Sequence, residues 1–127
     1  MNKPLFKTIS TVLIWSENFR VLADWYKRVF DFEIISELNH PQDTGVQFRV
    51  GNVNLWIGQH SEVHGKNRDP HRHMFNISVE SVEEVYQYLL SKDVKFFAKP
   101  FKAPTFDKYF ATFYDLDGNM VQLIGGK

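Results

Sequence analysis

Four histidines in one polar stretch are the residues whose type and spacing most directly suggest chemistry. They are His60, His64, His71 and His73. His71 and His73 are two residues apart, a spacing that places two imidazoles on one face of a strand, and imidazole binds transition metals. The polar surroundings favour the alternative, in which these side chains are exposed in a loop and hold no ion.

A second candidate surface comes from two alternating segments on either side of Gly51-Asn52. A Gly-Asn pair in this setting is typical of a two-residue hairpin, whose turn fixes the pairing register. One face is expected to lie in the core and carries Val46, Phe48, Val50, Val53, Leu55 and Ile57. The other face has Arg49 opposite Asn54 and Gln47 opposite Trp56. A face that mixes Trp, Arg and amides is either exposed to solvent or a binding surface.

Several other kinds of chemistry are excluded by the sequence. The chain has no cysteine, which excludes disulfides, Cys-ligated zinc, iron–sulfur clusters and thiol catalysis. It contains no Ser/His/Asp motif, no phosphate-binding glycine loop and no HExxH. Residues 95–102 interleave lysines with phenylalanines, as in a nucleic-acid patch or in a strand with core Phe and solvated Lys.

Length and composition indicate a single globular domain. Its 127 residues fall within the usual size of one domain, and hydrophobic residues at 43% with charged residues at 24% exclude a disordered chain. Lys and Arg number 15 and Asp and Glu number 15, so no basic excess favours nucleic acid or a membrane surface. The apolar run Val12–Trp15 is too short for a signal peptide or a membrane span. We therefore expect a cytoplasmic protein with no nucleic-acid or membrane partner.

The first half of the chain predicts one strand, one helix and three further strands. Residues 9–15 are β-branched and apolar, as in a strand. Apolar residues recur at helical spacing over 19–30, with Asn18 as N-cap and Asp31 as a left-handed residue that ends the helix. The remaining elements are a strand over 32–38, a turn over 39–43 and the hairpin over 46–57.

The second half repeats this order. Ser81 and Glu84 form a capping box before a helical stripe that Asp93 ends, and Thr11 corresponds to Met74, 63 residues later. The predicted strands cover 74–79, 94–97, 109–114 and 120–124. The chain is thus one domain over 1–127, with module one at about 7–58, a linker at 59–72 and module two at about 73–125.

Two longer segments carry a recognisable pattern. Residues 18–33 include Trp25-Tyr26 and Asp31, and residues 113–123 read FYDLDGNMVQL. They are similar to the first helix and to the closing signature, F-x-D-P-D-G-N-x-I-E-L, of the glyoxalase/bleomycin-resistance/extradiol-dioxygenase (vicinal oxygen chelate) superfamily. Leu116 replaces the usual Pro. The resemblance covers nearly the whole chain and implies an α+β fold of two βαβββ modules, whose curved mixed sheet forms a cup with the helices outside.

Metal-dependent members of that superfamily hold a divalent cation with His or Glu side chains on the first and last strands of each module. The resemblance places at these positions Thr11, Met74, Gln122 and, on the last strand of module one, Asn54 or Trp56. Neutral side chains of this kind are weak ligands compared with carboxylates and imidazoles. We therefore expect no metal and no cofactor, although a one-residue bulge would bring His73 into the place of Met74.

The expected lining of the cup is apolar and aromatic with several amides and one cation. It comprises Leu13, Trp15, Gln47, Arg49, Asn54, Trp56, Met74, Asn76 and Gln122. Such a lining suits a small organic molecule with a flat apolar part and a polar or anionic edge. Arg49 would pair with the anion, and Trp15 and Trp56 would stack, although Trp15 could equally cover the start of the helix.

Three functions remain open from the sequence. The neutral ligand set favours a metal-free small-molecule binding protein, like the bleomycin-binding members of the superfamily. The second is a metal-dependent glyoxalase-type lyase or isomerase, or a dioxygenase, with ligands at other positions. The third is a subunit without catalysis that acts in regulation or assembly. The resemblance also implies a homodimer, with a cup inside each chain or with modules exchanged between chains.

Overall fold

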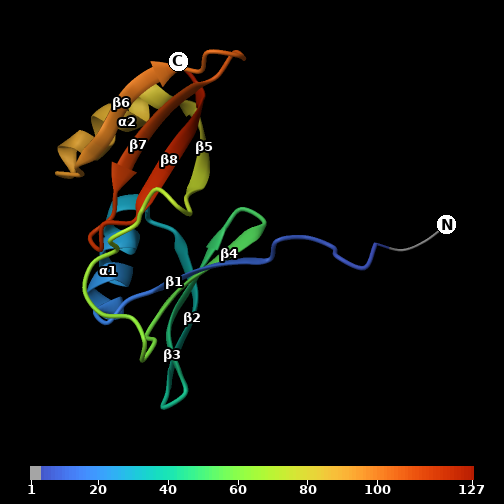
Figure 1. Ribbon diagram of the computed structural model, residues 1–127, viewed down its shortest axis with the longest axis vertical. Helices are drawn as coiled ribbons and strands as arrows, with labels where there is room; N and C mark the ends of the chain where they lie inside the picture. The colour runs from blue at the N-terminus through green and yellow to red at the C-terminus, as the bar shows by residue number, and fades with distance from the viewer. Residues whose placement is uncertain (1–3) are drawn as a thin grey trace. The chain divides into compact units, whose positions relative to one another are not determined.

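The computed structural model describes residues 4–127 and contains two modules in succession along the chain (Figure 1). The first compact unit ends at His64 and the second begins at Gly65. Each consists of one strand, one helix and three more strands, so the predicted order βαβββ, written twice, is confirmed. Within residues 4–127 no helix is long and apolar enough to cross a membrane.

The first module is a four-stranded mixed sheet with one helix. Its elements are β1 (Thr11–Trp15), α1 (Phe19–Phe30), β2 (Glu33–His40), β3 (Asp43–Val50) and β4 (Val53–Gly58). The strand order is β1-β4-β3-β2, and β1 runs parallel to β4 while the other neighbours are antiparallel. The last strand of the module, β4, therefore lies inside the sheet and is hydrogen-bonded to a neighbouring strand along both of its edges.

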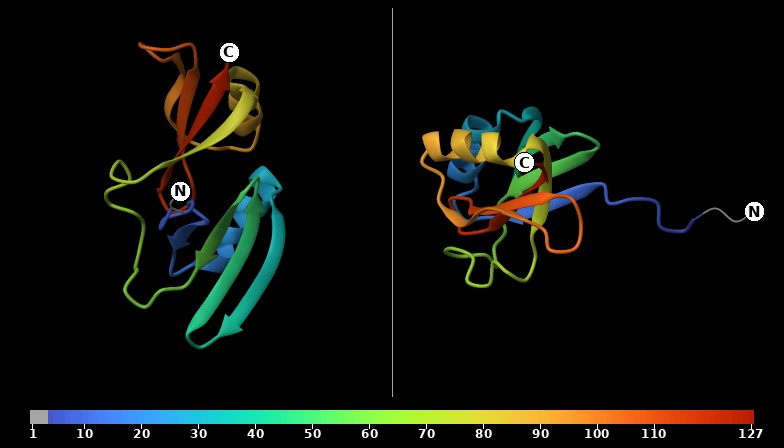
Figure 2. Two further views of the ribbon diagram at one scale, coloured as in Figure 1. Left: turned by 90° about the vertical axis from the view of Figure 1, so that its right-hand side faces the viewer. Right: turned by 90° about the horizontal axis from the view of Figure 1, so that it is seen from above.

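Helix α1 covers one face of this sheet. It contacts β3 and β4, and the left view of Figure 2 shows it on one side of these strands. Four of the predicted core residues of the hairpin are buried, namely Val46, Phe48, Leu55 and Ile57. The opposite face, here called the helix-free face, carries the alternate residues, which include Leu13, Trp15, Gln47, Arg49, Asn54 and Trp56.

The second module has the same topology. Its elements are β5 (Phe75–Ser81), α2 (Val82–Ser91), β6 (Phe96–Lys102), β7 (Tyr109–Tyr114) and β8 (Met120–Gly126). The order is β5-β8-β7-β6, with β5 parallel to β8, and α2 contacts all four strands. Phe113, Val121 and Leu123 are buried on one face, whereas Asn76, Thr112 and Gln122 alternate with them and share the other face.

An aspartate in the left-handed conformation follows each helix, directly after α1 and two residues after α2, at the positions that the sequence predicts. The φ angles are 55° at Asp31 and 61° at Asp93. Asn and Asp tolerate this region better than other non-glycine residues, although glycine adopts it without strain. Lys27 lies 2.8 Å from the Asp31 carboxylate, and the resulting hydrogen bond and charge attraction lower the pKa of Asp31.

The two helix N-termini differ in how they are capped. The Ser81 hydroxyl accepts a hydrogen bond from the backbone N–H of Glu84 at 3.1 Å, which confirms the predicted cap of α2. Asn18 is the N-cap residue of α1, but its side chain makes no capping bond. Instead the buried Ser16 hydroxyl accepts the backbone N–H of Asn18 at 3.0 Å, so the local turn holds the chain at the helix entrance.

Two predicted boundaries are wrong. The expected turn over 39–43 is reduced to Pro41-Gln42, because β2 and β3 continue to pair as far as His40 opposite Asp43. Strand β6 runs to Lys102 rather than stopping at residue 97, with two register shifts against β7 that accommodate Pro100. Residues 59–74 contain no helix or strand.

Candidate functional site

The helix-free face of the first sheet is a regular array of side chains, because the registers of all three strand pairs are defined. Arg49 stands opposite Asn54 and Gln47 opposite Trp56, as the Gly51-Asn52 turn predicts. Residues that pair across the four strands β1, β4, β3 and β2 form rows on this face. The first row is Thr11, Asn54, Arg49 and Glu33. The second row is Leu13, Trp56, Gln47 and Ser36, and the third is Trp15, Gly58, Gly45 and Leu38. The first row is therefore polar, the second mixes apolar and polar side chains, and the third consists of Trp15, two glycines and Leu38.

Arg49 is the fixed cation of the polar row. Its Nε donates a hydrogen bond to Oδ1 of Asn54 at 2.9 Å. Among the residues that the structure describes, its terminal nitrogens have no hydrogen-bond or ion-pair partner, and Glu33, directly opposite on β2, forms no ion pair with it. Because Asn54 orients the guanidinium, its two terminal nitrogens can bind a carboxylate or phosphate in the bidentate manner.

Trp56 leans away from Arg49 and is only 6% exposed. A Cβ built on Gly58 would lie 2.7 Å from Cε2 of Trp56, and one built on Gly45 would lie 2.6 Å from its Cζ2. The indole therefore occupies the space left by two paired glycines. Within residues 4–127 no cation–π contact joins Arg49 to Trp56. This burial is unfavourable for the stacking role expected of Trp56, since little of its ring surface is open.

Trp15 carries the accessible aromatic surface of this face. It is 36% exposed, and its ring makes edge-to-face contacts with Trp56 at 6.5 Å and with His60 at 5.2 Å. It shares the helix-free face with Leu13, which is 54% exposed. Trp15 and Leu13 thus form an exposed apolar edge beside the buried indole.

The second module places Asn76 and Gln122 opposite each other on the parallel pair β5–β8. Gln122 donates from Nε2 to the Thr112 hydroxyl at 3.1 Å, across to β7. Leu13 stands opposite Trp56 in the first module, and Asn76 lies 63 residues after Leu13, the same spacing as between Thr11 and Met74. Met74 lies immediately before β5, two residues before Asn76 and therefore on the same strand face.

An aromatic cluster on this same face of the second sheet was not predicted. Phe101 stacks on Phe110 with centroids 5.9 Å apart, and Phe106 contacts Phe110 edge to face at 5.9 Å. Phe101 and Phe106 are exposed, whereas Phe96 contacts Phe113 beneath α2. The interleaved Lys and Phe residues of 95–102 were the only sequence signal, and periodicity alone did not separate the core Phe from the exposed ones.

The residues at the positions of the superfamily's metal ligands do not fit a divalent cation. Thr11, Met74, Gln122 and either Asn54 or Trp56 carry no charge, and Oδ1 of Asn54 already accepts a hydrogen bond from the Arg49 guanidinium. A fixed positive charge beside the would-be ligand repels a cation, and neutral oxygens hold one weakly. Among residues 4–127 no three His, Asp or Glu side chains are grouped as a metal site.

The four histidines of the polar stretch are engaged separately where they have contacts. His60 lies against Trp15, and its Nδ1 accepts the backbone N–H of Glu62 at 3.0 Å. His64 lies 3.5 Å from Glu17, and His71 contacts the ring of Phe97 at 5.1 Å. The His71-x-His73 pair is in a segment without strand structure, so the predicted shared strand face is absent there.

The turn between β7 and β8 is held together by hydrogen bonds to one carboxylate. The buried Asp115 carboxylate accepts the backbone N–H groups of Asp117 at 2.8 Å and Asn119 at 3.0 Å, and the Asn119 side-chain amide at 2.9 Å. Gly118 has φ of 78°, a conformation that favours glycine. This turn fixes the register of β7 with β8 and hence the position of Gln122 opposite Thr112.

Paired βαβββ modules joined to such a closing turn define the glyoxalase class of folds. The family model described as Glyoxalase/Bleomycin resistance protein/Dioxygenase superfamily matches residues 8–123. The chain therefore belongs to the glyoxalase/bleomycin resistance protein/dioxygenase superfamily. A search of curated proteins finds no significant match.

Solved structures with the same fold cover nearly all of the chain. A glyoxalase family protein from Enterococcus faecalis is 22% identical over 95% of this chain and 99% of its own, with a TM-score of 0.79. A putative glyoxalase family protein from Bacillus anthracis is 17% identical over 99% and 100%, with a TM-score of 0.78. Lactoylglutathione lyase from Agrobacterium tumefaciens is 19% identical over 97% and 96%, with a TM-score of 0.72. Likeness at this level of identity shows the fold alone.

Proposed function

We propose that this protein binds a small organic anion with an apolar ring on the helix-free face of the first sheet, without a metal ion. The observation that carries the proposal is the Arg49 guanidinium, which Asn54 orients through a 2.9 Å hydrogen bond and whose terminal nitrogens have no partner among the described residues. An oriented guanidinium binds a carboxylate or phosphate with less loss of side-chain entropy than a free one.

The apolar part of the ligand would lie over Leu13 and the exposed edge of Trp15. Leu13 and Arg49 are two strands and two residues apart, which is about 12 Å between Cα atoms on a flat sheet. A molecule with one or two rings and an acidic substituent spans that distance once the side chains reach toward it. Gln47 and Asn54 lie between these ends and supply amide groups for a polar edge.

The chemistry of the face supports binding rather than catalysis. The side chains that would meet the ligand are Leu13, Trp15, Gln47, Arg49 and Asn54. None of these five is a carboxylate or an imidazole able to transfer a proton, nor a thiol nucleophile, and the carboxylate that borders them is Glu33, opposite Arg49. The neutral residues at the metal-ligand positions of the superfamily point in the same direction.

The test is a fluorescence titration with aromatic carboxylates and their uncharged analogues. Trp15 should report occupancy, and Arg49→Ala should weaken binding of the acids by about tenfold, the order expected for one charge-assisted hydrogen-bonded contact. Arg20→Ala is the matched control, because it removes the same charge from an exposed position on α1. No binding of any acid, or equal weakening by both variants, would overturn the proposal.

A further inference from the structure

A hollow at the far end of the first sheet shares Trp15 with the proposed anion site but does not include Arg49. It has a volume of about 610 Å³ and is lined by Trp15, Pro41, Gln42, Asp43, Thr44, Gln59, His60 and Ser61. Every lining residue belongs to the first module. The volume is within the range of small-molecule pockets. Trp15 was expected in the cup lining and His60 in the histidine cluster, whereas the other lining residues were not anticipated as part of a site.

Hydrogen bonds between strand ends hold the walls of this hollow. The backbone N–H of Gln59 donates to the Thr44 carbonyl at 2.9 Å, and that of Ser16 donates to the Gly58 carbonyl at 2.9 Å. The chain after β4 is therefore tied to β3 on one side and to the end of β1 on the other. Trp15 is fixed in turn by its edge-to-face contact with His60.

The charge of the lining is negative. Asp43 is its one carboxylate, it forms no ion pair within the described chain, and no Lys or Arg lines the hollow. His60 accepts a backbone N–H at Nδ1, a bond that needs the tautomer with its proton on Nε2. An unpaired carboxylate beside an indole is the combination that recognises an organic cation, through charge attraction and a cation–π contact.

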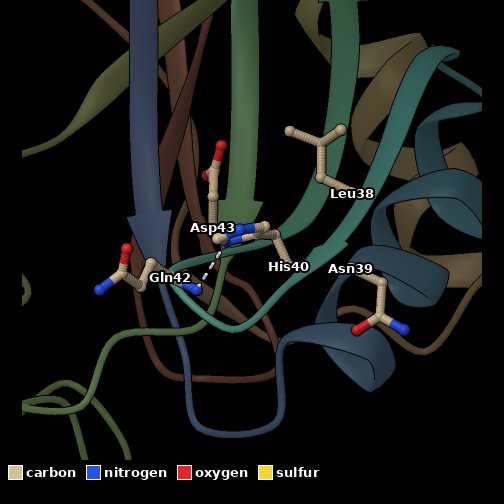
Figure 3. A pocket seen from close by; sticks show the side chains of 5 residues that line it. All are labelled: Leu38, Asn39, His40, Gln42 and Asp43. Atoms are coloured by element: carbon tan, nitrogen blue, oxygen red, sulfur yellow. Dashed lines mark hydrogen bonds between the residues drawn. The ribbon is translucent and has the colours of Figure 1, made fainter.

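Asp43 is also reached from the neighbouring hollow at the tip of the β2–β3 hairpin. This second hollow is lined by Leu38, Asn39, His40, Gln42 and Asp43, as Figure 3 shows. There the backbone N–H of Gln42 donates to Nδ1 of His40 at 3.1 Å, a bond that needs the same tautomer. Asp43 is thus the one carboxylate of both hollows, and neither is lined by Lys or Arg.

The two ends of β3 have opposite charge on the same face. Asp43 and Arg49 share the helix-free face and are six residues apart, or about 20 Å along an extended strand. That separation is too long for one small ligand to engage both. We propose that the hollow between Trp15 and Asp43 is a separate binding site for organic cations, namely substituted ammonium groups attached to a ring.

The test uses three probes of the same size, benzyltrimethylammonium, benzyl alcohol and benzoate, titrated while the indole resonances are followed by NMR. The cation should shift the Trp15 resonance and bind more tightly than the alcohol, and any Trp15 shift that benzoate causes should depend on Arg49 and be unchanged in Asp43→Asn. Asp43→Asn and Trp15→Ala should each weaken cation binding by about three- to tenfold. Asp24→Asn, on the exposed side of α1, is the control of equal charge and should leave binding unchanged.

The outcomes also separate this site from the proposed anion site. Arg49→Ala should leave cation binding intact, and Asp43→Asn should leave acid binding intact. Equal binding of benzyl alcohol and the cation, equal weakening by Asp24→Asn, or no saturable shift up to about 10 mM cation would overturn the inference.

Discussion

The indole of Trp56 lies against the Cα of Gly58, two residues further along the same strand. A methyl group at Gly58 would approach Cε2 of Trp56 to 2.7 Å, closer than carbon atoms pack. Side chains two apart on a strand share a face, so only a residue without a side chain at 58 leaves room for the ring. Gly45, paired with Gly58 across the sheet, supplies the rest of the space.

Gly58→Ala should therefore destabilise the protein by about 1–3 kcal/mol, the usual cost of overpacking a filled site. The measurement is urea unfolding followed by circular dichroism. In a Trp56→Phe background the smaller ring should remove at least half of that cost. An equal cost in both backgrounds would instead assign it to the Thr44 carbonyl, which lies 3.0 Å from the added methyl position.

Glu33→Gln should strengthen the binding of aromatic acids by about two- to fivefold. Glu33 stands directly opposite Arg49 on the same face, and its negative charge opposes that of the ligand. Glu37→Gln is the control, because the irregularity between Ile34 and Ser36 places Glu37 opposite Val46, on the other face. The gain should shrink in high salt. A comparable gain from the control would mean that net charge, rather than the site, governs affinity.

Elemental analysis of protein purified without a histidine tag should find divalent metal well below an equimolar amount. Thr11 and Gln122 are neutral, and Asn54 is hydrogen-bonded to the Arg49 guanidinium, so these side chains cannot compete with water for a divalent metal ion. An equimolar amount of nickel, zinc, manganese or iron that disappears in Gln122→Ala would contradict the prediction. It would revive the metal-dependent lyase or dioxygenase hypothesis.

Asp93→Gly should stabilise the protein by about 0.5–1 kcal/mol, because glycine adopts the left-handed conformation at this position without strain. Thermal and urea unfolding would measure the gain. A loss of stability in Asp93→Gly would show that the aspartate side chain contributes more than its backbone strain costs.

Asp31→Gly should gain less at neutral pH, because it also loses the hydrogen bond and ion pair to Lys27. The pKa of Asp31 is lowered in the folded state, so the Lys27 contribution is present above the unfolded value of 3.8 and is lost as the pH falls through the folded pKa. The difference between the two glycine variants should therefore close in acid. A difference that is independent of pH would exclude the ion pair as its source.

Features governed by residues close in sequence were predictable. The Gly51-Asn52 turn set the pairing of Arg49 with Asn54, and the Ser81 cap and the left-handed Asp31 followed from local backbone chemistry. The repeated element order and the closing turn around Asp115 were also predictable, since each follows from patterns within short segments of the chain. These signals led to the fold and the superfamily.

Contacts between segments distant in sequence decided the rest. Trp56 is buried because Gly45, from another strand, leaves space for its ring, and the residues next to Trp56 in the sequence do not predict this contact. Asn76 stands opposite Gln122 in a parallel pair, whose register is not fixed by a tight turn. The hollow beside Trp15 likewise exists only where the ends of β1, β3 and β4 are brought together. The sequence by itself determined which residues share a strand face, since alternation is a property of the chain, and only the tertiary structure decided which of them remain open to a ligand.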